Sequence, residues 1–320
     1  MSRLRVAVVG AGYLGRFHAE KYRAVPAADL VGVCDVDAAA GQSAAAALGT
    51  RFFADHRELA GLVDAVTIAA TTSAHFELAR FFLEQGVHVL VEKPMTRTAE
   101  EARVLTELAE ARGLKLQVGH VERFNPALLS AREGLTAIDF IECHRLAPFK
   151  RRGADVNVVL DLMIHDLDVT LSLVGSKPCD VSAVGIGVLT DTVDIANARI
   201  EFESGAIANV TASRVSASAQ RRFRVFQRNQ YVSIDFGEGE VRRVITHAGR
   251  GDEDPLKFER WSLDKGDALL AETEAFVDAI LNDKACVVSG RDGVAALELA
   301  EAIIEDIDRR AKRRTRDRAP

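Results

Sequence analysis

A glycine-rich segment directly after the first apolar run is the feature that most constrains the fold of this 320-residue chain. The apolar run covers residues 4–9, and the segment behind it reads Gly10-Ala11-Gly12-Tyr13-Leu14-Gly15. Residues 13–23 then have helical character. Glycines at these positions permit a tight turn, a close approach of backbone to a ligand, and close packing of a helix on a strand. The pattern predicts a strand, a turn and a helix that open a βαβ unit.

Alternation of strands and helices continues through the first part of the chain. Residues 38–48 are rich in alanine and are stopped by Gly49, while Thr98 and Glu101 predict a capping box at the start of another helix. The expected strands cover 4–9, 30–34, 52–53, 64–69, 87–91 and 116–118, and the expected helices cover 13–23, 38–48, 73–84 and 98–113. This alternation predicts a parallel sheet with helices on both faces, so we assign residues 1–121 to a doubly wound α/β domain of the Rossmann type.

The second half of the chain has a different period. Apolar and polar residues alternate along 196–202, 208–213 and 232–236, as in antiparallel strands with one apolar face. Hairpin turns are expected at 203–205 and 229–230. Helices of roughly 268–281 and 293–310 close the chain. We therefore expect residues 122–320 to form a C-terminal α+β domain around an open, largely antiparallel sheet.

Composition and charge exclude several classes of protein. With 48% hydrophobic and 28% charged residues, the chain can bury a core without disulfides or metals. A net charge of −6 argues against a nucleic-acid binder, and no apolar run is long enough to span a membrane. The four cysteines are scattered without metal-ligand spacing, so no metal is expected. Because the first residues run into a strand without a signal peptide, we expect a cytoplasmic protein.

In this context the glycine segment predicts a dinucleotide site. The pyrophosphate is expected at the N-terminus of the first helix, against the backbone of Gly10, Ala11, Gly12, Tyr13, Leu14 and Gly15. Asp35 ends the second strand, about twenty residues beyond the last glycine, where an acid binds a ribose 2′-hydroxyl. A carboxylate there repels a 2′-phosphate, so NAD is expected as the cofactor rather than NADP.

Glu92-Lys93-Pro94 places a charged pair directly after an apolar strand. Doubly wound sheets bind their ligands at this end of their strands, and Pro94 favours an extended backbone at Lys93. A second polar group follows the next strand and is expected at the same rim: His120, Arg123 and Asn125. Arg123 is a candidate clamp for an anion or a sugar hydroxyl, or alternatively a structural partner in an ion pair.

A third polar cluster lies in residues 161–168. Asp161 and His165 are spaced i,i+4 and share one face of an expected helix, and Asp168 is placed to orient His165. An imidazole exchanges a proton near neutral pH, whereas carboxylates in an apolar helix cost free energy unless they are satisfied. We therefore expect acid–base chemistry here. Buried hydrogen bonding is the alternative, and a metal pair is disfavoured because no third ligand stands at recognisable spacing.

Together these motifs resemble the glucose-fructose oxidoreductase/inositol dehydrogenase (Gfo/Idh/MocA) family over nearly the whole chain. The resemblance rests on the glycine segment, Glu92-Lys93-Pro94, and Asp161 with His165. It implies a Rossmann domain plus an open-sheet domain that associates through sheet faces into homodimers or homotetramers. It also implies catalytic roles at a carbinol for Lys93, Asp161 and His165. Cofactor contacts are implied for Thr71, Thr72, His75, Glu92 and Lys93, and substrate contacts for His120, Arg123, Asn125, Asp161 and His165.

The segments 119–126, 145–149 and 161–168 resemble the branch that oxidises nucleotide sugars. In particular they are similar to bacterial UDP-N-acetylglucosamine 3-dehydrogenases, which supply a 3-keto sugar for lipopolysaccharide or lipid A synthesis. Residues 157–160 lack the glycines of many members, and Thr71 stands where many have proline; both departures weaken the free-sugar and polyol branches. A free-sugar or inositol dehydrogenase stays an alternative, as does a catalytically silent NAD-binding sensor or scaffold.

The implied chemistry is hydride transfer from a sugar carbinol to NAD. Lys93, as an ammonium, would stabilise the developing alkoxide. His165 would accept the hydroxyl proton, directly or through Lys93. Asp161 would position the substrate and help to keep Lys93 charged. From the sequence, the roles of Lys93 and His165 can be exchanged.

Overall fold

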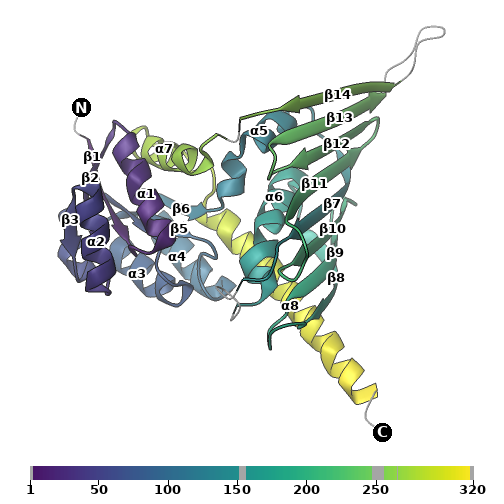
Figure 1. Cartoon of the computed structure of the whole chain (residues 1–320), viewed down its shortest axis with the longest axis horizontal. Helices are drawn as coiled ribbons and strands as arrows, with labels where there is room; N and C mark the ends of the chain where they lie inside the picture. The colour runs from purple at the N-terminus through teal and green to yellow at the C-terminus, as the bar shows by residue number, and fades with distance from the viewer. Residues whose placement is uncertain (1–2, 151–155, 247–255, 265, 318–320) are drawn as a thin grey trace. The chain divides into compact units, whose positions relative to one another are not determined.

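The computed structural model describes residues 3–150, 156–246, 256–264 and 266–317 and divides the chain into two compact units (Figure 1). The first unit combines Met1–Phe124 with Asp267–Val294, and the second combines Asn125–Gly266 with Ala295–Pro320. Within the described residues, no helix has both the length and the apolar character that crossing a bilayer requires.

The first unit is built on a parallel sheet of six strands in the order β3-β2-β1-β4-β5-β6. The strands are β1 (Leu4–Val9), β2 (Ala28–Cys34), β3 (Arg51–Phe53), β4 (Ala65–Ile68), β5 (His88–Glu92) and β6 (Leu116–Gly119). The helices are α1 (Tyr13–Ala24), α2 (Ala38–Leu48), α3 (Thr72–Glu84), α4 (Ala99–Ala111) and α7 (Ala268–Leu281), with short 3-10 turns η1 (His56–Leu59) and η2 (Val121–Phe124). The strand order reverses between β1 and β4, and ligands bind at such a switch point in doubly wound folds.

Helices cover both faces of this sheet. From β1 the chain moves outward to β2 and β3, whereas from β4 it moves the opposite way to β5 and β6. Right-handed crossovers therefore place α1 and α2 on one face and α3 and α4 on the other. Buried side chains of α1, α2 and α7 share one hydrophobic core, among them Tyr22, Ala44 and Phe276. The doubly wound Rossmann prediction is confirmed.

Local sequence signals account for the ends of these helices. The Asp37 carboxylate accepts hydrogen bonds from Ala39 N and Ala40 N at 3.0 and 3.1 Å, and Gly49 ends α2 with a left-handed φ of 60°. At α4, Thr98 Oγ1 accepts from Glu101 N at 3.2 Å, as expected of a capping box. The Glu101 carboxylate accepts instead from Arg97 N, one residue earlier than the reciprocal bond of that motif.

The second unit contains an eight-stranded sheet in the order β14-β13-β12-β11-β7-β10-β9-β8. Its strands are β7 (Ile138–Leu146), β8 (Pro178–Ile186), β9 (Ile195–Phe202), β10 (Ile207–Ser213), β11 (Gln220–Gln227), β12 (Gln230–Asp235), β13 (Glu240–Thr246) and β14 (Leu256–Ser262). In the described part of the chain, neighbouring strands are antiparallel except for β7 and β10, which run parallel. This confirms the largely antiparallel sheet, of whose strands the period-2 pattern predicts only β9, β10 and β12.

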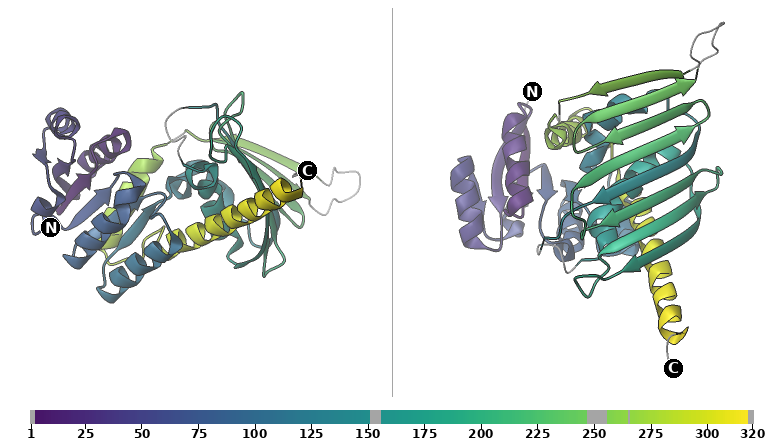
Figure 2. Two further views of the ribbon diagram at one scale, coloured as in Figure 1. Left: turned by 90° about the horizontal axis from the view of Figure 1, so that it is seen from below. Right: turned by 45° about the vertical axis from the view of Figure 1, so that its right-hand side comes forward.

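One face of this sheet packs against helices. They are α5 (Pro126–Arg132), α6 (Ile164–Val174), which follows the π-helical turn η3 (Val159–Met163), and the C-terminal part of α8 (Gly290–Asp317). Buried residues of β9, such as Ile200, pack in one core with Leu128, Leu167 and Ile303 of these helices. The right-hand view of Figure 2 shows the sheet from its other face. Between the buried residues of β9, the exposed Asn197 donates from Nδ2 to Thr211 Oγ1 of β10 at 2.8 Å.

Helix α7 lies in the first unit, which differs from the expectation that residues 122–320 form one domain. Its bounds, Ala268–Leu281, match the prediction. Its apolar face is buried, with Phe276 and Val277 in the core that also contains Tyr22 of α1. A contact between residues so far apart in the sequence leaves no local signal, which is why the sequence pattern did not reveal it.

We predict that Phe276→Ala lowers the free energy of unfolding by about 3–5 kcal/mol, because a fully buried ring is deleted from the first core. Leu281→Ala is the control, because Leu281 ends the same helix and is 46% exposed. Its change should be within about 0.5 kcal/mol. Denaturant titration checks both, and equal effects of the two changes would contradict the burial of α7 in this core.

Candidate active site

The glycine segment forms a tight turn after β1. Gly10 has a φ of 99°, and a Cβ there would lie 2.6 Å from the carbonyl carbon of Ala69. A Cβ on Gly15 would lie 1.7 Å from the Gly10 oxygen, so α1 packs directly on the turn. No described atom lies within 4 Å of a Cβ built on Gly12, and no described side chain caps the N-terminus of α1. A turn of this kind at a helix N-terminus suits an anionic group.

Asp35 connects the end of β2 to this turn. Its Oδ2 accepts a hydrogen bond from Ala11 N at 2.6 Å, and its Oδ1 accepts from Asp37 N at 2.8 Å. The side chain is half-buried. The carboxylate thus fixes the backbone of the glycine segment and brings a negative charge to the switch point of the sheet. Its predicted contact with a ribose hydroxyl stays a prediction.

The Glu92 carboxylate points into the first unit. His18 Nε2 lies 2.7 Å from Glu92 Oε1, and Lys93 N donates to Glu92 Oε2 at 3.1 Å. Gly119 pairs with Glu92 across β5 and β6, and a Cβ on Gly119 would lie 2.9 Å from the carboxyl carbon. Glu92 is therefore a buried hydrogen-bonding residue, and its predicted cofactor contact stays a prediction. Lys93, directly after β5, is half-buried.

His75 links two loops at the same end of the sheet. Its ring is buried, with Nδ1 3.0 Å from the oxygen of Pro94 and Nε2 3.1 Å from the oxygen of Ala70. Burial lowers the pKa of His75, so a neutral ring has one N–H for two carbonyls. The ring thus supports the segment after Lys93 from inside. Thr71 and Thr72 lie at the N-terminus of α3, where Thr71 is exposed.

Two of the three polar residues after β6, Arg123 and Asn125, are hydrogen-bonded to the protein itself. His120 is buried, and burial together with the charge of Lys93 lowers its pKa to about 3. Arg123 donates from Nη2 to the Val287 oxygen at 3.2 Å and lies 3.7 Å from Asp292. This favours the structural alternative for Arg123 over the anion clamp. Asn125 caps α5 by accepting from Ala127 N at 3.0 Å. The predicted substrate contacts of His120, Arg123 and Asn125 stay predictions.

Asp161 and His165 lie in the second unit. Asp161 belongs to the π-helical turn η3, and His165 to the first turn of α6, where one regular helix was expected. Both are half-buried, whereas Ile164, Asp166 and Asp168 beside them are buried. π-Helical turns are rare and occur frequently at functional sites. Asp161 and His165 are thus partly accessible, and their predicted contact with a substrate stays a prediction.

Family models match both parts of the chain. Residues 4–120 match the model described as "Oxidoreductase family, NAD-binding Rossmann fold", and residues 147–312 match the model of the family's C-terminal alpha/beta domain. The chain belongs to the Gfo/Idh/MocA oxidoreductase family. It is an NAD-dependent oxidoreductase, and the NAD-binding domain coincides with the sheet that carries the glycine segment and Lys93.

Several members of the family are similar over nearly their full length. The UDP-N-acetylglucosamine 3-dehydrogenase of Acidithiobacillus ferrooxidans is 42% identical over 311 residues, which cover 95% of this chain and 98% of the relative. A solved structure of that enzyme, covering 96% of this chain and 98% of its own, has a TM-score of 0.90 at 40% identity. The inositol 2-dehydrogenase of Rhizobium meliloti is 27% identical, over 95% of this chain and 97% of the relative.

Two buried ion pairs that the sequence analysis did not assign support the family's second domain. Arg145 of β7 donates from Nε and Nη2 to both carboxylate oxygens of Asp166 at 2.9 Å. Both side chains are at most 5% exposed. The pair fixes the start of α6, next to His165, against the sheet. Asp168, which was expected to orient His165, is itself buried.

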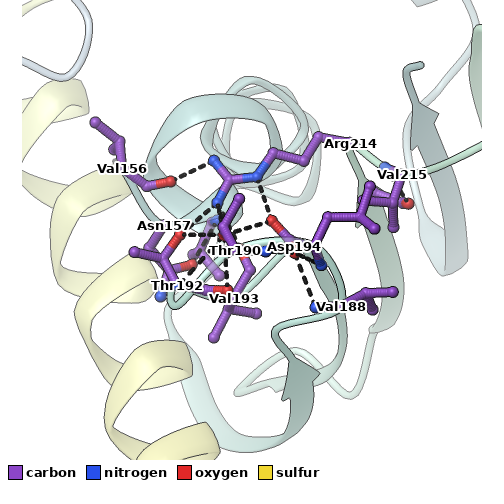
Figure 3. Close-up of polar contacts among 12 residues, drawn as sticks. Val156, Asn157, Val188, Thr190, Thr192, Val193, Asp194, Arg214 and Val215 are labelled. Carbon is purple, nitrogen blue, oxygen red and sulfur yellow. Dashed lines mark hydrogen bonds and ion pairs between the residues drawn. The ribbon is translucent and has the colours of Figure 1, made fainter. Parts of the chain in front are cut away.

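The second pair anchors the segment that leads into η3 (Figure 3). Arg214 donates from Nε to Asp194 Oδ1 at 2.7 Å and from Nη1 to the Val156 oxygen at 2.5 Å. Val158 N donates to the Val193 oxygen at 3.1 Å. The guanidinium thus connects the end of β10, the loop before β9 and the residues directly before η3.

The charge on Asp194 is well satisfied. Its Oδ2 accepts from the backbone N–H groups of Val188, Leu189 and Thr190 at 2.6–2.9 Å. Burial opposes its ionisation, but these N–H groups and Arg214 outweigh burial and hold the pKa of Asp194 below its usual range. Asp194 is therefore a fixed anion, and Arg214 is its buried counter-charge.

We predict that Arg214→Met lowers the free energy of unfolding by about 3–5 kcal/mol, because it leaves the fully buried charge of Asp194 without its cation. The control is Arg222→Met, which breaks a partly exposed pair with Asp235 and should change stability by at most about 1 kcal/mol. Denaturant titration of the second unit's transition measures both. If Arg214→Met lowers the free energy of unfolding by less than Arg222→Met does, the Arg214–Asp194 pair does not anchor the segment before η3.

Proposed function

We propose that the protein oxidises carbon 3 of UDP-N-acetylglucosamine, or of a related nucleotide sugar, to a ketone. The observation that carries this proposal is the 42% identity with the enzyme from A. ferrooxidans across both domains of the two chains. The presence of Lys93, Asp161 and His165 supports a catalytic role over that of a silent NAD-binding sensor. We also propose that the open sheet face of the second unit mediates a homodimer or homotetramer, which light scattering tests.

The first unit has the features that NAD requires. Side chains are sterically excluded at Gly10 and Gly15, while Gly12 faces open space in the described structure. This cradle, with the uncapped N-terminus of α1, suits a pyrophosphate. We propose that Gly10, Ala11, Gly12, Tyr13, Leu14 and Gly15 hold NAD together with Asp35, and that Thr71, Thr72 and Lys93 contribute further contacts. When bound, NAD supplies the acceptor of a hydride.

The chain's own residues would orient the sugar and move its proton. Lys93 is proposed to donate a hydrogen bond to the carbinol oxygen and to stabilise its developing negative charge. His165 is proposed to accept the hydroxyl proton. Asp161 is proposed to bind the sugar and to favour the charged form of Lys93. Exchange of the proton-accepting role between Lys93 and His165 is the alternative.

We predict that the purified protein reduces NAD with UDP-N-acetylglucosamine, and that Lys93→Met and His165→Asn each lower kcat by at least about 100-fold, the usual contribution of such groups. Lys115→Met is the control, because Lys115 pairs with the exposed Asp283 away from these residues. The assay follows NADH absorbance, with and without 2-oxoglutarate as acceptor, because NADH that is reoxidised in place would otherwise escape detection.

Other outcomes of this assay separate the rival functions. Turnover of inositol or a free sugar without turnover of any nucleotide sugar would support the alternative branch. NADH binding without turnover of any substrate would support a silent sensor. Near-normal turnover of both variants would contradict the proposed roles of Lys93 and His165.

We predict that Asp35→Ser weakens the preference for NADH over NADPH at least tenfold, because the substitution removes the carboxylate that would repel a 2′-phosphate. Fluorescence titration of each nucleotide measures the ratio without any sugar. Asp29→Ser is the control, because Asp29 lies near the start of β2, the strand that Asp35 follows, and pairs with Arg3 at the surface. An unchanged ratio for Asp35→Ser would remove Asp35 as the determinant of cofactor preference.

A further inference from the structure

Two glutamates are buried together behind the lysine segment, in the interior of the first unit. One ligand atom from each of His18, Glu92 and Glu272 lies within 4.8 Å of the other two. The Glu272 side chain, on α7, is fully buried, and neither of its carboxylate oxygens has a hydrogen-bond partner among the described residues. Glu92, by contrast, is bonded through His18 and through the N–H of Lys93. Among the described residues, the hydrogen-bond partners of these two carboxylates are thus all on Glu92.

Electrostatics does not allow both carboxylates to be charged. Each ion is costly to bury, and two like charges at this separation repel each other strongly. Burial and the neighbouring charge of Glu92 raise the pKa of Glu272 well above its usual value. For Glu92 burial acts in the same direction, but His18 and Lys93 outweigh it and lower its pKa. The proton of the pair therefore resides on Glu272.

A metal ion could also neutralise two carboxylates, but the geometry favours a proton. His18 Nε2 and Glu92 Oε1 are 2.7 Å apart, the length of a direct hydrogen bond. Two tetrahedral ligands at about 2.0–2.1 Å from a zinc ion are farther apart than this. The direct bond between His18 and Glu92 thus closes the space that an ion bound to both would occupy.

We propose that Glu272 is a positioning residue for Lys93: it stays a neutral carboxylic acid and thereby leaves a single negative charge on Glu92, next to the lysine. This inference rests on the proposed function of Lys93. The charge on Glu92 favours the ammonium form of Lys93, which the alkoxide requires. Gln117 lies beside Glu272: its Nε2 donates to the Glu272 backbone oxygen at 3.1 Å, and its Oε1 has no partner among the described residues.

Other titratable groups lie near this pair. Helix α3 contributes His75, whose pKa burial lowers although the charge of Glu92 opposes the shift. Helix α1 contributes Tyr22 as well as His18, and Tyr22 is hydrogen-bonded to Thr67 with its pKa raised by burial. The segment after β6 contributes His120, whose pKa burial lowers to about 3. Neither Tyr22 nor His120 therefore changes charge near neutral pH, where the test is made.

The experiment compares Glu272→Gln with the matched control Glu274→Gln, an exposed glutamate on the same helix. The unfolded Glu272 loses its proton above its ordinary pKa of 4.5, whereas the folded one retains it. Stability of the wild type should therefore decline relative to E272Q as pH rises from 4.5 toward the folded pKa, by up to about tenfold in the folding equilibrium constant per pH unit. E274Q should show no such trend. This measurement needs no substrate, so it stands apart from the proposed function.

Infrared spectroscopy observes the proton directly. The wild type at neutral pH should show the carbonyl stretch of a protonated carboxylic acid, and E272Q should lack this band. If E272Q does not fold, the wild-type spectrum alone decides the matter. Absence of the band at neutral pH would overturn the proposal, and absence of the band with a stoichiometric metal found by elemental analysis would replace the proton with a cation.

Activity tests the link to Lys93. E272Q should keep the wild-type pH profile of kcat/KM, because glutamine mimics the neutral acid. Glu92→Gln should lower kcat at least tenfold and move the profile to lower pH, because the charge that favours the lysine ammonium is lost. A shift of the profile in E272Q equal to that in E92Q would show that Glu272 is ionised and would overturn the proposal.

Discussion

The inward direction of the Glu92 side chain is the constraint on which the rim of the first unit depends. Glu92 is the last residue of β5 and is buried, whereas Lys93, directly after the strand, is half-buried. The interior position is available because residue 119 on the neighbouring strand is glycine. It is tolerated because His18 meets the carboxylate at 2.7 Å. The lysine for which we propose a catalytic role thus follows directly after a buried acid.

Much of the first unit could be predicted from the sequence because its signals are local. Glycines that no other residue can replace mark the first turn, and the caps at Asp37 and Gly49 give α2 the bounds that were expected. The period-2 pattern likewise predicted β9, β10 and β12. It did not reveal β7 or β11, whose partly buried residues Glu142 and Arg224 pair with each other across the two strands at 3.0 Å.

The rest could not be predicted because it depends on contacts between distant parts of the chain. Arg145 and Asp166 are 21 residues apart, and Arg214 and Asp194 are 20 apart. Nothing in the residues between them identifies the partner. The same reasoning applies to Arg123. From the sequence, a ligand clamp and a structural ion pair were both possible for it, and its guanidinium contacts the Val287 oxygen 164 positions later. Side-chain direction, and with it the roles of these residues, follows from packing rather than from spacing.

The return of Asp267–Val294 to the first unit means that the chain passes between the units at three places: after Phe124, after Gly266 and after Val294. The NAD-binding unit is therefore not encoded by one continuous stretch. A fragment that ends at residue 124 would lack α7 and would expose the apolar side of α1 around Tyr22 to water. Exchange of whole domains between members of this family thus requires three junctions. Because α1 and α7 share one core, the stability of the first quarter of the chain depends on residues from the last quarter.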